Sequence, residues 1–531
     1  MAKAPAFYLG GTRALDGAGP SADLRLPAHH FVTHGVVVGM TGSGKTGLTT
    51  VTIEEALNAG IPVLAIDVKG DLPNLLLAFP DFDSAHLLPW VEGCASPDDS
   101  RTHEEIAQAL CEQRRTGLEA WHVGEAELSA YTSKTEVRVI TPGCSAGEPL
   151  HLLSSLERRS PRWDQDPESA RAALSAAISL VLRLLGRDPD PAKSREHVLL
   201  SILAERRFRA GQSAELNALL QDVTSPPIEQ VGALPINQFI SKSARKELAA
   251  ALNTLLASPT FSAWREGATL DVGEWLTPKE GRTPAVILSV AHLEDEERAL
   301  VLGVVLEEVL AWVRSLPGSQ RLRALVVFDE VYGFLPPHPQ NPPTKRPLVA
   351  LMKQARAFGV GVIVATQNPM DLDYRALSNA GLWCIGRLQT DADRARVMDG
   401  LASSIDADRE SLAALARTVQ RLAPRWFVIR DVHVENGIAL MQPRWAMSLL
   451  RGPMTRAELR RAREARRGGL EKPVSGEVAV EQSDITPEAG PGTIEPALAD
   501  PPFADATLSA RHHTLSTVKP ARHASTIDFE H

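Results

Sequence analysis

The sequence predicts an α/β protein built around a mainly parallel β-sheet. Short apolar runs at 35–39, 61–67 and 285–291 indicate buried strands, and a helical stretch that ends near Leu57 lies between the first two. A strand, a helix and a strand within about 30 residues form a βαβ unit, whose two strands run parallel. With 531 residues, of which 44% are hydrophobic, the chain can form two or three compact units and a large core.

The same pattern continues along the chain. Further strands are expected at 137–143, 324–330, 361–369 and 382–388, with a long helix from Glu294 to Arg314. The segments 425–432 and 438–445 are expected to form a β pair. Between 166 and 280 the apolar residues have helical spacing, so we expect a helical subdomain inserted into the α/β core.

These patterns divide the chain into parts. We expect an N-terminal lead-in at 1–34, an α/β core at 35–165 and 281–450, the helical insert at 166–280, an Arg-rich helix at 451–469 and a tail at 470–531. The Arg-rich helix begins with a capping-box pattern at Thr455 and Glu458. The tail is rich in Pro, Ala, Ser, Thr and acids without periodicity, and is therefore expected to be disordered.

Composition excludes some classes of protein. The formal net charge of −9 gives no whole-chain positive field for nucleic acid, so DNA binding would need a local basic lining. The four cysteines form no CxxC pair, which is typical of reduced thiols in a cytoplasmic protein. No run reaches the ~18 apolar residues that a membrane span needs, and the first residues lack the apolar segment of a signal peptide. We therefore expect a cytoplasmic protein that does not contact a membrane.

A glycine-rich segment after the first predicted strand has the pattern of a phosphate-binding loop. Residues 39–46 fit GxxxxGK[ST] at every specified position, namely Gly39, Met40, Thr41, Gly42, Ser43, Gly44, Lys45 and Thr46. Glycines let successive backbone N–H groups point at one anion, and the following helix adds its positive N-terminal end. Lys45 is expected to reach the β- and γ-phosphates, and the Thr46 hydroxyl to bind Mg²⁺.

Two predicted strand ends carry the residue types that hydrolysis needs. Asp329 would hold Mg²⁺ through its water shell, and Glu330 would orient or deprotonate the attacking water. Gln367, at the tip of the strand at 361–369, could contact both the γ-phosphate and the water. The alternative is that these side chains are only polar strand ends that meet solvent.

Other P-loop proteins agree less well with the sequence. Asp67 to Gly70 fits the DxxG of GTPases, but no guanine-reading NKxD motif follows. An ABC transporter ATPase would need an LSGGQ-like signature, which is absent, and a small-molecule kinase usually lacks a catalytic Glu after its Mg²⁺-binding Asp. The sequence therefore favours an ATPase that uses ATP and Mg²⁺.

Together these motifs resemble a known family. The segments at 33–46, 66–72, 328–330, 353–361 and 365–369 are similar to the HerA/FtsK group of ring-forming DNA motors, and more narrowly to bacterial HerA-like ATP-binding proteins. The resemblance implies a RecA-like (ASCE) core, a hexamer with ATP sites between subunits, and double-stranded DNA in a central channel. HerA proteins commonly carry an N-terminal β-barrel, for which the residues before the phosphate-loop strand are too few.

The resemblance also assigns residue roles. Asp67 matches the acid after the second strand, which belongs to the nucleotide site, and Glu330 matches the catalytic glutamate. Arg356 matches the arginine finger that reaches a neighbour's γ-phosphate, while Arg387 is a second candidate. Without that role, Arg356 would be a cation stabilised by a helix C-terminus.

The functional expectation is an ATP-driven DNA translocase or helicase. HerA relatives often work with a nuclease or an anti-phage effector, which are the expected partners besides DNA. The alternative is a nucleotide-switched scaffold that assembles an effector with little translocation. Basic clusters at 206–209, 242–246 and 345–353 could face DNA or could be solvated surfaces.

Overall fold

The computed structural model describes residues 5–17, 21–92, 101–157, 159, 162–258, 261, 263–369, 372–373, 377, 380–402, 409–434 and 437–468. The predicted disordered tail at 470–531 lies outside these residues, so that expectation stays a prediction.

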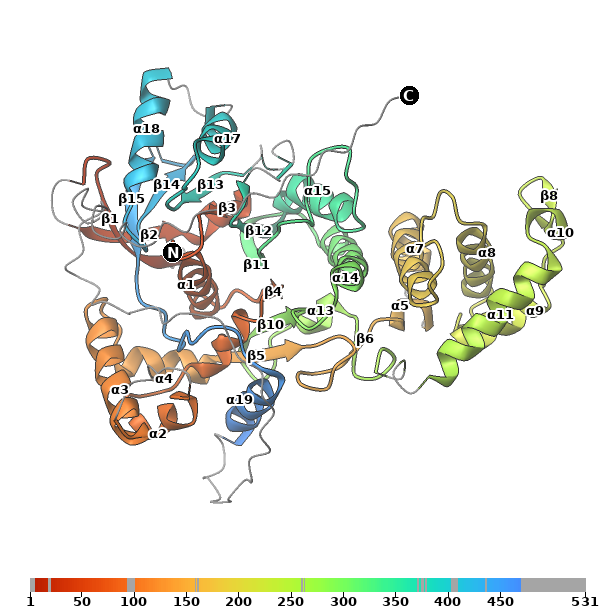
Figure 1. The fold of residues 1–531 in the computed structure, drawn as a ribbon, viewed down its shortest axis with the longest axis horizontal. Helices are drawn as coiled ribbons and strands as arrows, with labels where there is room; N and C mark the ends of the chain where they lie inside the picture. Colours follow the sequence, from red (N-terminus) through yellow and green to blue (C-terminus); the bar gives the residue numbers. More distant parts are fainter. Residues whose placement is uncertain are drawn as a thin grey trace, which may run out of the picture.

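An 11-stranded sheet forms the centre of the described molecule (Figure 1). Its strands, in spatial order, are β2 (Ala22–Pro27), β1 (Ala6–Arg13), β15 (Ile438–Pro443), β14 (Phe427–Asp431), β13 (Leu382–Ile385), β3 (Gly35–Val38), β12 (Phe358–Thr366), β11 (Ser319–Asp329), β4 (Val63–Asp67), β10 (Thr283–Ser289) and β5 (Thr135–Ile140). From β13 to β5 every neighbouring pair is parallel, and from β13 to β2 every pair is antiparallel.

Helices cover both faces of the sheet because successive strand residues point to opposite sides. On one face Val37 packs with apolar residues of α1 (Lys45–Asn58), α3 (His103–Glu119) and α4 (Glu125–Lys134). On the other face Val36 and Val38 join the core formed with α14 (Asp295–Ser315) and α15 (Lys345–Gln354). β3, β4 and β10 are buried on both faces, which explains their continuous apolar sequences.

The strand order positions the site. β12 lies between β3, which leads into the glycine-rich loop, and β11, which ends at Asp329. The order β13-β3-β12-β11-β4 is the RecA-like arrangement, so the predicted fold class is confirmed. Because these strands are parallel, their carboxyl ends lie at one edge of the sheet.

The predicted lead-in contains structure that the sequence analysis did not anticipate. β1 and β2 form the antiparallel edge of the sheet, and β1 pairs with β15. Gly10 and Gly11 resemble turn signals, yet Gly10 lies in β1, and a Cβ there would come within 2.2 Å of the Gln442 carbonyl oxygen. Close approach of two backbones therefore explains this glycine. The predicted pairing of the last two strands, β14 with β15, is confirmed.

Residues 166–280 are mostly helical and extend to one side of the sheet (Figure 1). The main helices here are α7 (Pro167–Leu184), α8 (Arg195–Arg209), α9 (Leu216–Thr224) and α11 (Lys242–Ala257), and α7 packs on α14. Short elements accompany them: α5 (Ser154–Glu157), α6 (Arg162–Gln165), α10 (Ile236–Phe239), α13 (Val272–Trp275), β6 (Leu150–His151), β7 (Gln230–Val231), β8 (Leu234–Pro235) and β9 (Ala268–Thr269). The domain boundaries stay a prediction.

The remaining elements connect the core. They are η1 (Ala28–Thr33), η2 (Leu72–Leu77), α2 (Ser84–Leu87), η3 (Leu88–Trp90), η4 (Ala355–Ala357), α17 (Asp391–Ala402), α18 (Arg409–Arg421) and α19 (Arg456–Gly468). The expected capping box at the start of α19 is present, because Glu458 accepts a hydrogen bond from the Thr455 N–H at 2.8 Å and Thr455 accepts one from the Glu458 N–H at 3.3 Å. None of the helices in the described part of the chain is both long and apolar enough to cross a membrane.

Candidate active site

The glycine-rich loop joins the carboxyl end of β3 to the first turn of α1. Gly42 and Gly44 have φ angles of 77° and 93°, which favour glycine. The N–H groups of Gly39, Met40 and Ser43 already donate to protein carbonyls, at 3.3, 2.9 and 3.1 Å. The first turn of α1 leaves its N–H groups without intrahelical acceptors. An anion at this loop would therefore meet the helix N-terminus together with the rest of the loop.

Lys45 lies inside the loop. The residue is only 8% exposed. Its Nζ donates to the carbonyl oxygens of Gly39 at 2.6 Å and Met40 at 3.0 Å. Burial lowers the Lys45 pKa to about 8, while the nearby Glu330 carboxylate acts in the opposite direction. A buried ammonium held mainly by carbonyls suits an anionic ligand such as a phosphate.

Two buried carboxyl groups lie side by side at the ends of neighbouring strands. Asp329 of β11 is in register with Asp67 of β4. Burial raises the Asp329 pKa to about 7, and the negative charge of Asp67 adds to this effect. Burial likewise raises the Asp67 pKa to about 6. Two buried carboxylates are unfavourable unless a positive charge lies beside them, and carboxylate oxygens are ligands that Mg²⁺ prefers. The residues present therefore fit Mg²⁺.

Asp67 also has a local structural task. Its two oxygens accept hydrogen bonds from the Gly70 N–H at 2.9 Å and from the Ser289 hydroxyl at 2.8 Å. It therefore fixes the turn after β4 and ties it to β10. Its predicted place in the nucleotide site stays a prediction.

Glu330 sits in a strained position at the same edge. Its φ of 63° is uncommon for a residue other than glycine, and such strain clusters at functional sites. Its Oε1 accepts from the Thr366 hydroxyl at 3.0 Å and from the Gln367 N–H at 3.2 Å. Its Oε2 accepts from the Lys69 Nζ at 2.7 Å. Strands β11 and β12 thus fix the direction of this carboxylate.

Gln367 connects the carboxylate to the glycine-rich loop. Its Oε1 accepts a hydrogen bond from the Thr41 hydroxyl at 2.5 Å, while its own N–H donates to Glu330. The structure therefore brings together the loop, Gln367 and Glu330, which the sequence predicted to cooperate. Thr46 lies at the start of α1, half-buried, where its hydroxyl can contribute to a cation site.

Lys69 is a residue that the sequence analysis did not single out as functional. Its side chain is 34% exposed and forms the ion pair with Glu330. The partners are far apart in sequence, so spacing alone could not predict the contact. The only sequence signal was its place in the segment 66–72 that matches the HerA-like family.

Arg356 lies at the opposite edge of the sheet from Glu330. It belongs to η4, which precedes β12, whereas Gln367 follows β12, and a strand of this length spans roughly 26 Å. Arg356 is exposed and lies close enough to His34 to help lower its pKa, which burial reduces to about 4. Its side chain cannot reach the glycine-rich loop of the same chain. The backbone carbonyl of Arg387, in contrast, accepts a hydrogen bond from the Met40 N–H at 2.9 Å, so Arg387 lies next to the glycine-rich loop of the same chain.

Several candidate DNA-facing cations have partners within the chain. Arg346 pairs with Glu307 at 2.7 Å, Arg207 pairs with Asp222, and Arg245 is buried and donates to Asn237. These contacts support the reading of these particular residues as structural.

A comparison with known protein families finds a match that includes the glycine-rich loop. The sequence model of the family "Helicase HerA-like C-terminal" matches residues 14–80, and no curated protein matches the chain. Among solved structures, VirB4 of Thermoanaerobacter pseudethanolicus is similar over 83% of this chain and 97% of its own, at 12% identity and a TM-score of 0.47. The plasmid coupling protein TrwB in complex with ADP and Mg²⁺ is similar over 84% of this chain and 97% of its own, at 14% identity and a TM-score of 0.44.

The family match spans the segment that includes β3, the glycine-rich loop, α1 and β4. The resemblance of this chain to the HerA-type P-loop ATPases, predicted from its motifs, is therefore confirmed, and residues 14–80 carry it.

Proposed function

We propose that this protein hydrolyses ATP and uses the energy to move DNA, as an oligomeric ring of the HerA type. The observation that carries the proposal is the chain of contacts from the glycine-rich loop through Thr41 and Gln367 to Glu330, beside Asp329. The proposal assigns phosphate binding to the glycine-rich loop, the role of base to Glu330 and cation binding to Asp329, which all lie at one edge of the sheet. The match to a helicase family over residues 14–80 supports the link to DNA.

The chemistry follows from these positions. The loop amides and Lys45 bind the triphosphate, and Thr46 and Asp329 would hold Mg²⁺, which when bound offsets the negative charge of the phosphates. Glu330 accepts the proton of the attacking water, while Gln367 orients that water against the γ-phosphate. Lys69 and Thr366 fix the orientation of the Glu330 carboxylate, so this side chain needs little rearrangement before the reaction.

A neighbouring subunit would complete the site. Arg356 lies at the edge opposite to its own loop and is exposed, so it is placed to reach a second subunit. An arginine supplied in this way can raise turnover by about 10³–10⁵. This geometry supports an oligomer, for which we propose a hexameric ring, and a nuclease or anti-phage effector as the partner that the resemblance implies.

A second function, a nucleotide-switched scaffold, is favoured by charge. The chain has a net charge of −9, and several of its candidate DNA-facing cations are paired internally. In that case nucleotide would control the binding of an effector, with slow hydrolysis and no movement along DNA.

The two functions are separated by one set of measurements on the purified full chain. ATP turnover is measured with and without double-stranded DNA, and movement is followed by displacement of a third strand bound to that duplex. The motor predicts turnover stimulated by DNA and displacement that depends on ATP, with both lost in Glu330→Gln. Turnover that ignores DNA, without displacement, would contradict the motor and favour the scaffold.

A further inference from the structure

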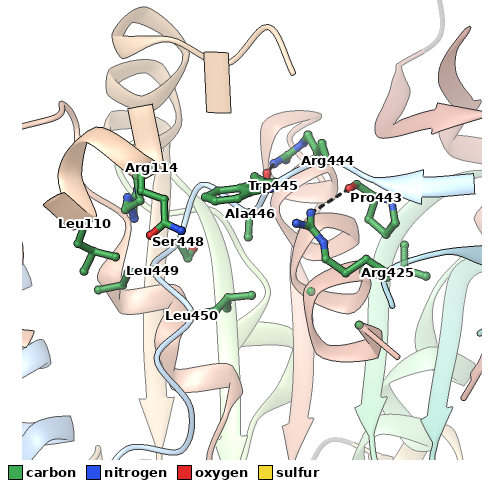
Figure 2. Close-up of a pocket in the computed structure, with 14 residues that line it drawn as sticks. Leu110, Arg114, Arg425, Pro443, Arg444, Trp445, Ala446, Ser448, Leu449 and Leu450 are labelled. Atoms are coloured by element: carbon green, nitrogen blue, oxygen red, sulfur yellow. Dashed lines mark hydrogen bonds between the residues drawn. The ribbon is translucent and has the colours of Figure 1, made fainter. Parts of the chain in front are cut away.

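A mostly apolar cavity of about 260 Å³ adjoins the glycine-rich loop. Its walls come from the start of α1 (Gly44, Gly47 and Leu48), from α3 and from residues 444–450, the extended segment after β15 that we call the strap. Figure 2 shows Leu110 and Arg114 of α3 on one side, Arg425 on the other, and Trp445 of the strap between them. Pockets for whole drug-sized ligands measure roughly 300–1,000 Å³, so this one suits a smaller group.

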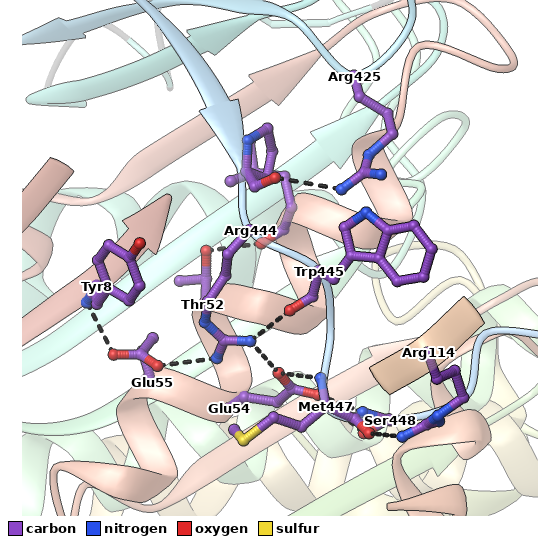
Figure 3. A network of polar contacts seen from close by, with 12 residues as sticks. Tyr8, Thr52, Glu54, Glu55, Arg114, Arg425, Arg444, Trp445, Met447 and Ser448 are labelled. Carbon is purple, nitrogen blue, oxygen red and sulfur yellow. Dashed lines mark hydrogen bonds and ion pairs between the residues drawn. The ribbon is translucent and has the colours of Figure 1, made fainter. Parts of the chain in front are cut away.

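The strap is held against α1 by a buried ionic network (Figure 3). Arg444, whose side chain is 1% exposed, donates to Glu54 at 2.9 Å and to Glu55 at 2.8 Å, and both acids belong to α1. Glu54 also accepts from the N–H groups of Met447 at 3.0 Å and Ser448 at 2.9 Å. The cavity wall therefore has a fixed position relative to the helix that begins at the phosphate loop.

Arg425 links the loop to the strap on the other side. Its N–H donates to the Ser43 carbonyl at 3.0 Å, and its guanidinium donates to the Pro443 carbonyl at 3.2 Å. The φ of Arg425 is 64°, a strained value for a residue with a side chain. The same guanidinium lies 5.6 Å from the centre of the Trp445 ring. Strain at this point is understandable if the position of Arg425 serves a ligand.

Trp445 is positioned by a glycine of α3. A Cβ on Gly117 would lie 2.4 Å from the indole, so only glycine leaves room for the ring. The Trp445 indole is half-buried, and Leu450, the strap residue near Gly47, is 36% exposed. Aromatic and aliphatic side chains are thus presented beside the glycine-rich loop.

We infer that this cavity receives the nucleobase of ATP, with Trp445 and Leu450 as the side chains that contact it. The inference rests on the proposed function, because that function fixes the direction of the nucleotide. The γ-phosphate end lies towards Gln367 and Glu330, so the base must leave the loop on the other side, past the start of α1. The cavity lies there, lined by Gly44, Gly47 and Leu48, and an aromatic wall gains contact with any base face.

The test compares two ligands on one set of variants. Affinities for ATP and for inorganic tripolyphosphate, each with Mg²⁺, are measured by titration calorimetry on wild type, Trp445→Ala, Trp445→Phe and Leu450→Ser. Trp163→Ala, which removes a half-buried indole in α6, is the matched control. Trp445→Ala should weaken ATP binding by about 5- to 100-fold and leave tripolyphosphate affinity unchanged. Trp445→Phe should restore most of the loss, and Trp163→Ala should bind both ligands as wild type does.

Other results would overturn the inference in distinguishable ways. If Trp445→Ala and Leu450→Ser both bind ATP with wild-type affinity, the base lies elsewhere while the proposed function stands. If Trp445→Ala does not fold, the partly exposed Leu450 decides, because Leu450→Ser should still weaken ATP and spare tripolyphosphate. If wild type binds neither ligand, or Lys45→Ala binds both normally, the proposed function fails and the inference fails with it.

Discussion

The buried ion pair between Arg444 and Glu54 makes a quantitative prediction. Arg444→Met keeps much of the side-chain volume but removes the guanidinium that pairs with Glu54, which is 0% exposed. Removing one partner of a buried pair typically costs about 3–5 kcal/mol, because the other charge stays buried. Glu54 keeps the N–H groups of Met447 and Ser448 and the Ser448 hydroxyl as donors. We therefore expect the lower end of that range, about 3 kcal/mol.

The assay is urea unfolding of wild type, Arg444→Met, Glu54→Gln and the double variant. The double variant should recover part of the loss, because it removes the uncompensated charge, and the cycle of four proteins isolates the pair. Arg171→Met, which breaks the exposed Arg171–Glu205 pair, is the control and should unfold at the wild-type urea concentration. If Arg444→Met is as stable as wild type, the network does not anchor the strap. A double variant less stable than both single variants would also refute the reasoning.

Three further predictions follow from the site. Lys45→Ala should lose ATP binding measured by calorimetry, because the buried ammonium that faces the loop is gone, and unchanged binding would contradict this. In the folded protein the His34 pKa of about 4 lies below its usual 6.5, so the free energy of unfolding of wild type falls by on the order of 3 kcal/mol as the pH drops from 6.5 to 4. His34→Asn should remove this acid-sensitive part of the stability. Urea unfolding at both ends of the window measures this, and an equal acid loss in the variant would count against it. Mixed Arg356→Ala and Glu330→Gln subunits should regain ATP turnover that neither variant has alone, whereas an inactive mixture would argue against a shared site.

Local patterns made much of the fold predictable. Strands β3, β4 and β10 are buried along their whole length, so their sequences are short apolar runs, and the loop at 39–46 fits a phosphate-loop pattern at every specified position. Asp329 and Glu330 could be placed at one edge because parallel strands end together. Their proximity to Gln367 followed from the same rule, and the structure shows the contact.

Features that depend on distant pairings could not be predicted. Lys69 and Glu330 are separated by 261 residues, and Arg444 and Glu54 by 390. Nothing in either local sequence identifies the partner. β1 escaped prediction for a similar reason, because Gly10 is explained by the close approach of β15, which is far away in the sequence. The cavity beside the loop combines four segments that are distant in the sequence, so it became visible only in the structure.

The most direct test of the central claim is the ATP turnover of Glu330→Gln beside its ATP affinity. The variant keeps the shape of the side chain and its acceptor for Thr366 and Gln367, but it cannot take a proton from water. We predict wild-type ATP affinity and a turnover reduced by about 10²–10⁴. Turnover at the wild-type rate would contradict the assignment of hydrolysis to this edge of the sheet.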